Sequence, residues 1–89
     1  MAHSNSAKKR IRQNVTRRAR NRWRIKTMRT AIKQFETALT SGSNEEATNA
    51  FREAAAIIDR TAQVGVIHDN QAARRKSRMN AKLKSKVTA

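Results

Sequence analysis

The sequence contains no cysteine and no proline, and only two of its 89 residues are glycine. Without cysteine the chain can form no disulfide bond, no thiolate metal site and no thiol nucleophile. Two glycines do not make a glycine-rich loop that cradles a phosphate, and no cluster of His, Asp and Glu has metal-ligand spacing. We therefore expect no metal, no cofactor and no small-molecule substrate, and we do not expect an enzyme.

Hydrophobic residues are also scarce, at 37% of the chain, and aromatic residues make up 3%. A chain of this length and composition supports one small domain with a thin core, which we assign to residues 1–89. No apolar run is long enough to cross a bilayer, and the N-terminus lacks the apolar segment of a secretory signal. We expect a cytoplasmic protein that makes no membrane contact and forms no homo-oligomer.

Acidic residues are absent from the first third of the chain, where twelve Lys and Arg residues lie between positions 8 and 33. The formal net charge of +15 divides into +12 over residues 1–33, −3 over residues 34–66 and +6 over residues 67–89. A solvated helical face usually carries both signs, so a block of one sign needs negative charge from a partner. A polyphosphate backbone meets that need best, and the mildly acidic middle is not expected to touch it.

The apolar residues of the first half predict one long helix, which we place at residues 7–40 after a polar leader. They step by three and four residues, the spacing of a core-facing stripe: Ile25, Met28, Ile32, Phe35 and Leu39. Upstream, the positions that would extend this stripe are Asn14, Arg18 and Asn21. The N-terminal half is thus basic nearly all round, and we expect it to project from the core.

Two further helices are expected, at residues 44–64 and 69–86. The second has an alanine-rich apolar face that allows close approach to the first helix: Ala47, Ala50 or Phe51, Ala54, Ile57 or Ile58, and Thr61. The apolar line of the third runs through Ala72, Met79 and Leu83, with the stem of Lys76 covering apolar surface, and Val87 is left open as an extension of it. The predicted fold class is all-α, a three-helix bundle with a long, protruding basic N-terminal helix.

Turn and capping signals separate these helices. Gly42 and Gly65 are each expected to take a left-handed conformation that ends the preceding helix. The stretch Ser43-Asn44-Glu45-Glu46 matches the capping-box pattern S-x-x-E at the start of the second helix. His68, Asp69 or Asn70 is expected to cap the third helix.

Two separated stretches carry a family resemblance. The first reads SAKKRIRQN at residues 6–14 and continues as RRARNR at residues 17–22, and the second reads GVIHDNQAARRKSRM at residues 65–79. In order and distance they resemble the bacterial small-subunit ribosomal protein family bS20, over nearly the whole chain. The resemblance implies direct binding to 16S ribosomal RNA, wedged between its 5′ domain and the long helix near its 3′ end. It implies a location in the cytoplasmic ribosome.

The predicted RNA-binding residues are fifteen of the cations in the two basic arms. In the first helix they are Lys8, Lys9, Arg10, Arg12, Arg17, Arg18, Arg20, Arg22, Arg24 and Lys26, and in the third Arg74, Arg75, Lys76, Arg78 and Lys82. We expect most of their contacts to reach phosphate and sugar, so that the RNA is recognised by shape. The two arms together are expected to bridge separate RNA segments.

Two rival functions belong to other classes. A DNA-compacting nucleoid protein would carry similar charge, but it would bind duplex DNA as tightly as ribosomal RNA. A membrane-surface helix needs a large apolar face, which residues 8–24 lack.

Trp23 departs from the residue expected of the family at that position. It lies well away from the apolar stripe of the first helix on a helical wheel. Its ring is interpreted either as a stacking platform for a base or ribose, or as a cover for neighbouring arginine stems.

Overall fold

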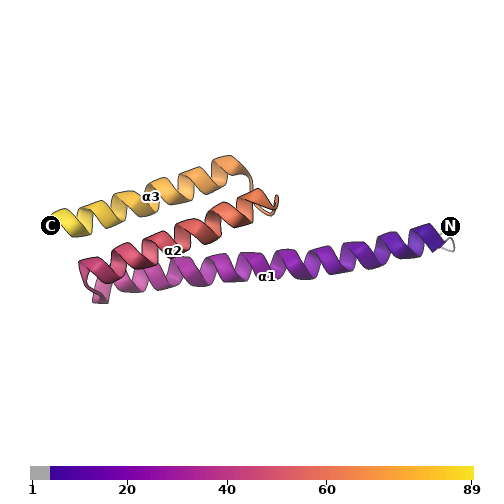
Figure 1. Ribbon diagram of the computed structural model, residues 1–89, viewed down its shortest axis with the longest axis horizontal. Coiled ribbons are helices and arrows are strands. Elements are labelled where there is room, and N and C mark those ends of the chain that lie inside the picture. The colour runs from indigo at the N-terminus through magenta and orange to yellow at the C-terminus, as the bar shows by residue number, and fades with distance from the viewer. Residues whose placement is uncertain (1–4) are drawn as a thin grey trace.

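The computed structural model describes residues 5–89, and all of its regular structure over that range is helical (Figure 1). Helix α1 spans Asn5–Ser41, α2 spans Asn44–Gln63 and α3 spans Asp69–Thr88. Helix α2 packs against both of the others, whereas α1 and α3 make little contact with each other. The all-α, three-helix prediction is confirmed.

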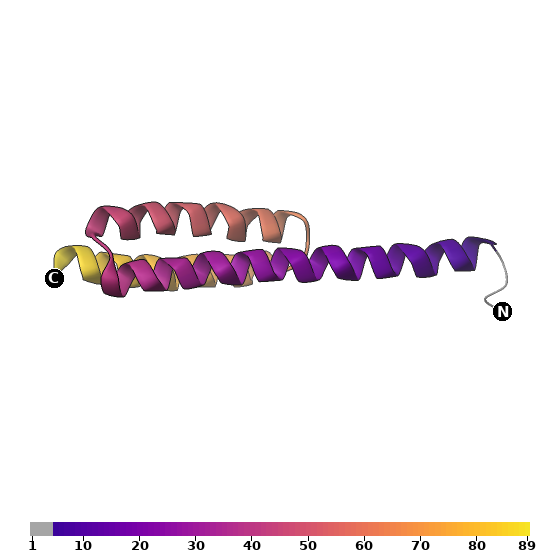
Figure 2. The same cartoon turned by 90° about the horizontal axis from the view of Figure 1, so that it is seen from below.

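Helix α1 extends far beyond the bundle (Figure 2). It has 37 residues, against 20 in each of the other two, so it is about 55 Å long where they are about 30 Å. Every residue from Lys8 to Trp23 is exposed, because no other helix covers this part. The predicted protruding basic helix is therefore present, and the molecule measures 63 × 22 × 14 Å.

The core lies where all three helices overlap. Its buried hydrophobic residues are Met28, Ala31 and Phe35 of α1, Ala47, Ala54 and Ile58 of α2, and Ala72, Met79 and Leu83 of α3. The rings of Phe35 and Phe51 pack at a tilt with their centroids 5.8 Å apart. Most of the predicted apolar positions are thus buried or half-buried, but Val87 is 48% exposed, because α3 ends beyond the core there. The open extension of the apolar line to Val87 is therefore not part of the core.

The ends of two helices differ from the expected ones by two residues. Asn5 and Ser6, expected in the polar leader, belong to α1, while residues 1–4 of that leader lie outside the described range. Helix α3 continues two residues beyond position 86. No glycine or proline interrupts either sequence, so the backbone hydrogen bonds can continue to these ends.

The start of α2 is held by the expected capping box. The Ser43 Oγ accepts a hydrogen bond of 3.1 Å from the Glu46 backbone N–H, and the Ser43 backbone N–H donates to Glu46 Oε2 at 3.3 Å. At the start of α3, His68 Nδ1 accepts from the Asn70 backbone N–H at 3.0 Å. These contacts satisfy amide groups that have no carbonyl partner inside the helix.

The two glycines act in different ways. Gly65 has φ +82°, and it ends α2 through two hydrogen bonds, from its own N–H to the Ala62 carbonyl and from the Val66 N–H to the Thr61 carbonyl. Gly42 does not have a positive φ, so the left-handed prediction is wrong there. A Cβ at Gly42 would lie 2.8 Å from the Ala38 carbonyl oxygen and 2.7 Å from Glu46 Oε2, so the position needs glycine for space.

Because of this difference, we expect the fold to tolerate asparagine at position 65 but not at position 42. Gly65→Asn should be mild because asparagine accepts the left-handed conformation and a Cβ there meets nothing within 4 Å, whereas Gly65→Ala should cost about 1–2 kcal/mol. Gly42→Asn and Gly42→Ala should both cost more than Gly65→Asn, because the Ala38 carbonyl is backbone. Urea unfolding followed by circular dichroism measures all four. Equal, mild effects at both positions would contradict the steric account of Gly42.

Candidate nucleic-acid interface

No cation of α1 forms an ion pair with an acidic residue of the described part of the chain. The only ion pairs among residues 5–89 join Lys76 to Asp59 at 2.6 Å and Lys82 to Glu36 at 3.9 Å, and both cations belong to α3. All ten predicted RNA-binding residues of α1 are therefore unpaired, and all except the half-buried Arg24 are exposed. Such a helix is surrounded by uncompensated positive potential.

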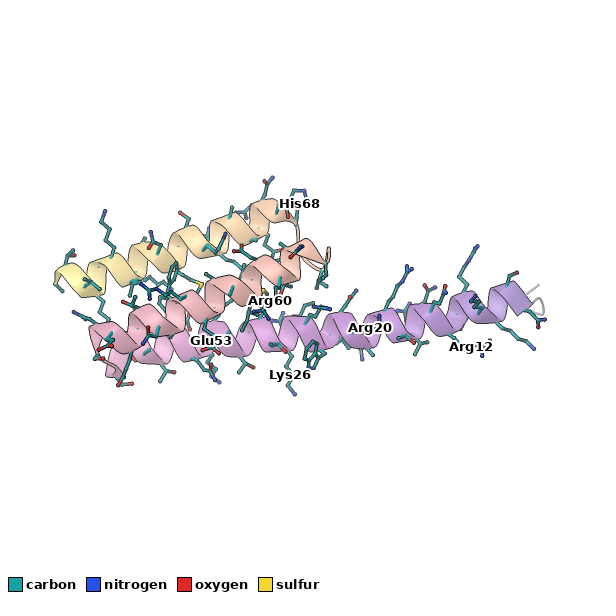
Figure 3. All side chains as sticks on the ribbon, viewed as in Figure 1. Arg12, Arg20, Lys26, Glu53, Arg60 and His68 are labelled. Atoms are coloured by element: carbon teal, nitrogen blue, oxygen red, sulfur yellow. The ribbon has the colours of Figure 1, made fainter. Side chains whose placement is uncertain are left out.

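One group of α1 cations lies on the face of the helix that runs from the projecting part to the α2–α3 turn. Lys9, Arg12, Arg17 and Arg20 line a shallow depression of about 360 Å³ on the projecting part of the helix. Arg12 and Arg20 are labelled there in Figure 3. Arg17 and Arg20 also join Arg24 around a notch of about 460 Å³ that is closed by the turn at residues 64–66. The α2–α3 turn thus forms one wall of a basic notch, which the sequence pattern does not reveal.

A second group lies on nearly the opposite face of α1. Arg22, Lys26, Arg29 and Lys33 share one surface depression and are spaced by four, three and four residues. Arg20 and Arg22 are about 200° apart around the helix, which places the two groups on opposite sides. Figure 3 shows Lys26 on the side of α1 that faces away from α2 and α3.

Arg29 and Lys33 were not among the predicted RNA-binding residues. Both are exposed, and they continue the line of Arg22 and Lys26 over the part of α1 that belongs to the bundle. The helical spacing from Arg22 was the signal that could have identified them. These residues share the turns of α1 that carry Met28 and Ile32, so the apolar stripe is the stronger pattern in that part of the sequence.

The five predicted residues of α3 are less uniform. Arg74 and Arg78 are exposed and lie one turn apart, so they form a small basic face. Lys76 is half-buried against Asp59, and Arg75 is half-buried with an Nε atom that has no hydrogen-bond partner. The ion pair of Lys82 with Glu36 is long, at 3.9 Å, and exposed to solvent. Such a pair contributes little to stability, so the Lys82 ammonium group remains available to a phosphate. Arg74, Arg78 and Lys82 are thus the better-placed members, and their role remains a prediction.

The described residues offer no cluster suited to metal binding. They contain no group of three or more His, Cys, Asp and Glu side chains that could hold a metal ion. None of the described helices is both long and apolar enough for a membrane span. The chemistry of this surface, within that range, is that of positive charge and one exposed aromatic ring.

We predict that the face formed by Arg22, Lys26, Arg29 and Lys33 contributes to RNA binding. Arg29→Glu with Lys33→Glu should weaken binding to 16S ribosomal RNA and lower the logarithmic salt slope by about 1 for each phosphate that is no longer neutralised. A salt series of binding measurements gives both quantities. The matched control is Arg52→Glu with Arg60→Glu on α2, which removes equal charge from two exposed residues. Equal weakening by both double variants would mean that net charge matters and the face does not.

Comparison with known proteins agrees with the sequence motifs. The family model described as Ribosomal protein S20 matches residues 2–84. Proteins named small ribosomal subunit protein bS20 are similar to the chain over nearly its whole length. That of Shewanella piezotolerans is 49% identical over 96% of this chain and 97% of its own. That of Nitrosococcus oceani is 44% identical over 96% and 98%, and that of Shewanella oneidensis 47% identical over 98% and 99%. The chain therefore belongs to the ribosomal protein S20 family of the small ribosomal subunit.

Proposed function

We propose that this chain binds 16S ribosomal RNA directly and that α1 and α3 hold separate segments of that RNA together. Its family consists of structural proteins of the small ribosomal subunit and not of enzymes, so its place is the cytoplasmic ribosome. The observation that carries the proposal is the set of unpaired cations on opposite faces of α1. A flat polyanion could neutralise only one of these faces.

Folded RNA supplies negative charge on several sides of a crevice. Phosphates from neighbouring RNA segments repel one another, and a helix with cations all round lowers that repulsion when it lies between them. Binding releases the counterions condensed on those phosphates, which favours the complex most at low salt. The projecting part of α1, with no side buried in the bundle, has the shape that such a crevice requires.

Helix α3 supplies the second basic surface. Helix α2 packs between α1 and α3, so the distance from the α1 cations to Arg74 and Arg78 is set by a packed core. A bundle of fixed geometry can hold two RNA surfaces at a fixed spacing, which two flexible basic tails cannot do. The acidic residues of α2 leave this middle helix unsuited to phosphate contact and separate the two basic surfaces.

The rival role in DNA compaction predicts a different competition result. A helix that lies along duplex DNA presents one face to the groove or backbone, and the opposite cations remain in solvent. The arrangement of α1 therefore favours an enclosed RNA site. Binding to ribosomal RNA should survive an excess of equal-length duplex DNA and transfer RNA at near-physiological salt.

Charge reversal on the projecting helix tests the direct binding. Arg17→Glu with Arg20→Glu should weaken 16S ribosomal RNA binding strongly and reduce the salt slope by about 2, because two phosphates are no longer neutralised. Helicity should change little, since both side chains are exposed and belong to no ion pair of the described chain. Filter binding and circular dichroism measure these effects, with Arg52→Glu plus Arg60→Glu as the control. Unchanged binding would remove this face from the proposal.

Bridging is tested with two separate RNA pieces. An immobilised 5′-domain RNA should capture a labelled fragment of the long helix near the 3′ end only when the protein is present. We expect Arg17→Glu with Arg20→Glu to lose one RNA piece, and Arg74→Glu with Arg78→Glu to lose the other, because the two surfaces are separate. If the wild-type protein binds each piece but never both together, the bridging role is refuted while direct binding stands.

A further inference from the structure

The turn between α2 and α3 meets α1 at the point where the basic helix leaves the bundle (Figure 1). The contact between the rings of Phe35 and Phe51 fixes the antiparallel register of α1 and α2. Val64 follows Phe51 by 13 residues, and 13 residues before Phe35 is position 22, so the turn lies level with about that position of α1. The lining of the basic notch of about 460 Å³ agrees with this register, because its α1 residues fall between positions 17 and 24.

Three arginines of α1 converge on this notch. Arg17, Arg20 and Arg24 lie within about 60° of one another around the helix and within about 10 Å along its axis. Their side chains are long, so the guanidinium groups can reach phosphates of neighbouring nucleotides in one strand. None of the three forms an ion pair within residues 5–89, so a phosphate that enters the notch displaces no acidic partner.

The wall that faces these arginines carries no charge. It is formed by Val64, which is 51% exposed, by Gly65 and by the half-buried Val66. A basic wall opposite an apolar one suits a sugar–phosphate backbone, because each ribose presents C–H groups next to its phosphate. Asn21 lines the same notch from α1, and its amide can donate to or accept from a ribose 2′-hydroxyl.

We propose that the sugar–phosphate backbone of one strand of 16S ribosomal RNA crosses this corner, with its phosphates on the three arginines and a ribose against Val64. The inference rests on the proposed RNA binding and adds an uncharged element of the bundle, the α2–α3 turn, to the interface. The corner also limits how far α1 enters an RNA crevice, because a strand held by the arginines abuts the end of the bundle.

The charge and size of the notch favour an RNA strand over a protein. A strand brings one phosphate with every nucleotide, which matches three arginines spaced along one face of a helix. A docked protein helix needs an apolar strip several turns long, whereas the apolar wall here consists of Val64 and Val66. A second copy of the chain, with a net charge of +15, would be repelled.

A carboxylate placed on the turn tests whether a strand lies against it. Val64→Asp should weaken binding to 16S ribosomal RNA about tenfold, because the new charge faces the phosphates across the notch. Val64→Asn, which has nearly the same shape without the charge, should weaken binding much less. Asn49→Asp makes the same amide-to-acid change on an exposed residue of α2 outside the notch, and it is the matched control. Equal weakening by Val64→Asp and Asn49→Asp would overturn the proposal.

The chain has no cysteine, so a single introduced thiol gives a second measurement that does not depend on charge reversal. Iodoacetamide should alkylate the thiol of Val64→Cys about tenfold more slowly in the complex with 16S ribosomal RNA than in the free protein, because the strand covers it. The thiol of Asn49→Cys, on the exposed surface of α2, should react at the same rate in both. A thiol at position 64 that reacts equally fast in the RNA complex would overturn the proposal. Protection that appears only in the assembled small subunit would also overturn it, because a neighbouring protein would then cover the turn.

A double-mutant cycle tests whether the turn and the arginines act on the same strand. Arg20→Ala should cost several-fold less affinity in the Val64→Asp background than in the wild-type protein, because both changes affect the same phosphates. Arg22→Ala is the matched control, since Arg22 lies on nearly the opposite face of α1, and its effect should be equal in the two backgrounds. Independent effects of Arg20→Ala and Val64→Asp would overturn the proposal.

Failure of this site and failure of the proposed function give different results. If selective binding to ribosomal RNA depends on Arg17 and Arg20 but is indifferent to every change at Val64, the corner site is refuted and the proposed function stands. If the wild-type protein fails to bind ribosomal RNA selectively, both are refuted.

Discussion

The structure depends on an excess of positive charge that the chain does not neutralise. The ten predicted RNA-binding cations of α1 have no acidic partner, and the cations of the two ion pairs of the described chain both belong to α3. A projecting helix with this charge has no packing of its own to oppose self-repulsion over Lys8 to Trp23. The rest of the fold can be understood as a small base that holds this helix and adds a second basic surface beside it.

The three-helix bundle that holds α1 is small, because many of its buried side chains are alanine. Ala31, Ala47, Ala54 and Ala72 are all buried, so the helices approach closely around a few large residues such as Phe35 and Ile58. Ser43 caps the start of α2, Gly65 ends α2 and His68 caps the start of α3, so these local contacts fix three of the helix ends. A core of this size is sufficient to fix the spacing of α1 and α3, which is what the proposed bridging of RNA segments requires.

Particular residues show which predictions follow from the chain and which do not. The buried positions Met28, Phe35 and Met79 follow from helical spacing, because a helix in water must bury its apolar face. The exposure of Val87 does not follow, because it depends on where the other helices end. Gly42 and Gly65 look alike in sequence, but only Gly65 has a positive φ. Gly42 is required for space, because a Cβ there would meet Glu46 and the Ala38 carbonyl. The RNA-binding role of the listed cations stays a prediction, and the structure adds Arg29 and Lys33 as further candidates, exposed on turns of α1 that also carry core residues.

The sequence by itself determined the helices, the direction of the core stripe and the one-signed charge of the first third of the chain. These properties depend only on residue types and on spacings of three or four positions, so they can be recognised within a short segment of the sequence. Only the tertiary structure decided that Lys76 meets Asp59 and that the turn at residues 64–66 closes a notch beside Arg17 and Arg20. Each of these joins residues far apart in the chain, and their distances are set by how three helices pack, which no local pattern records.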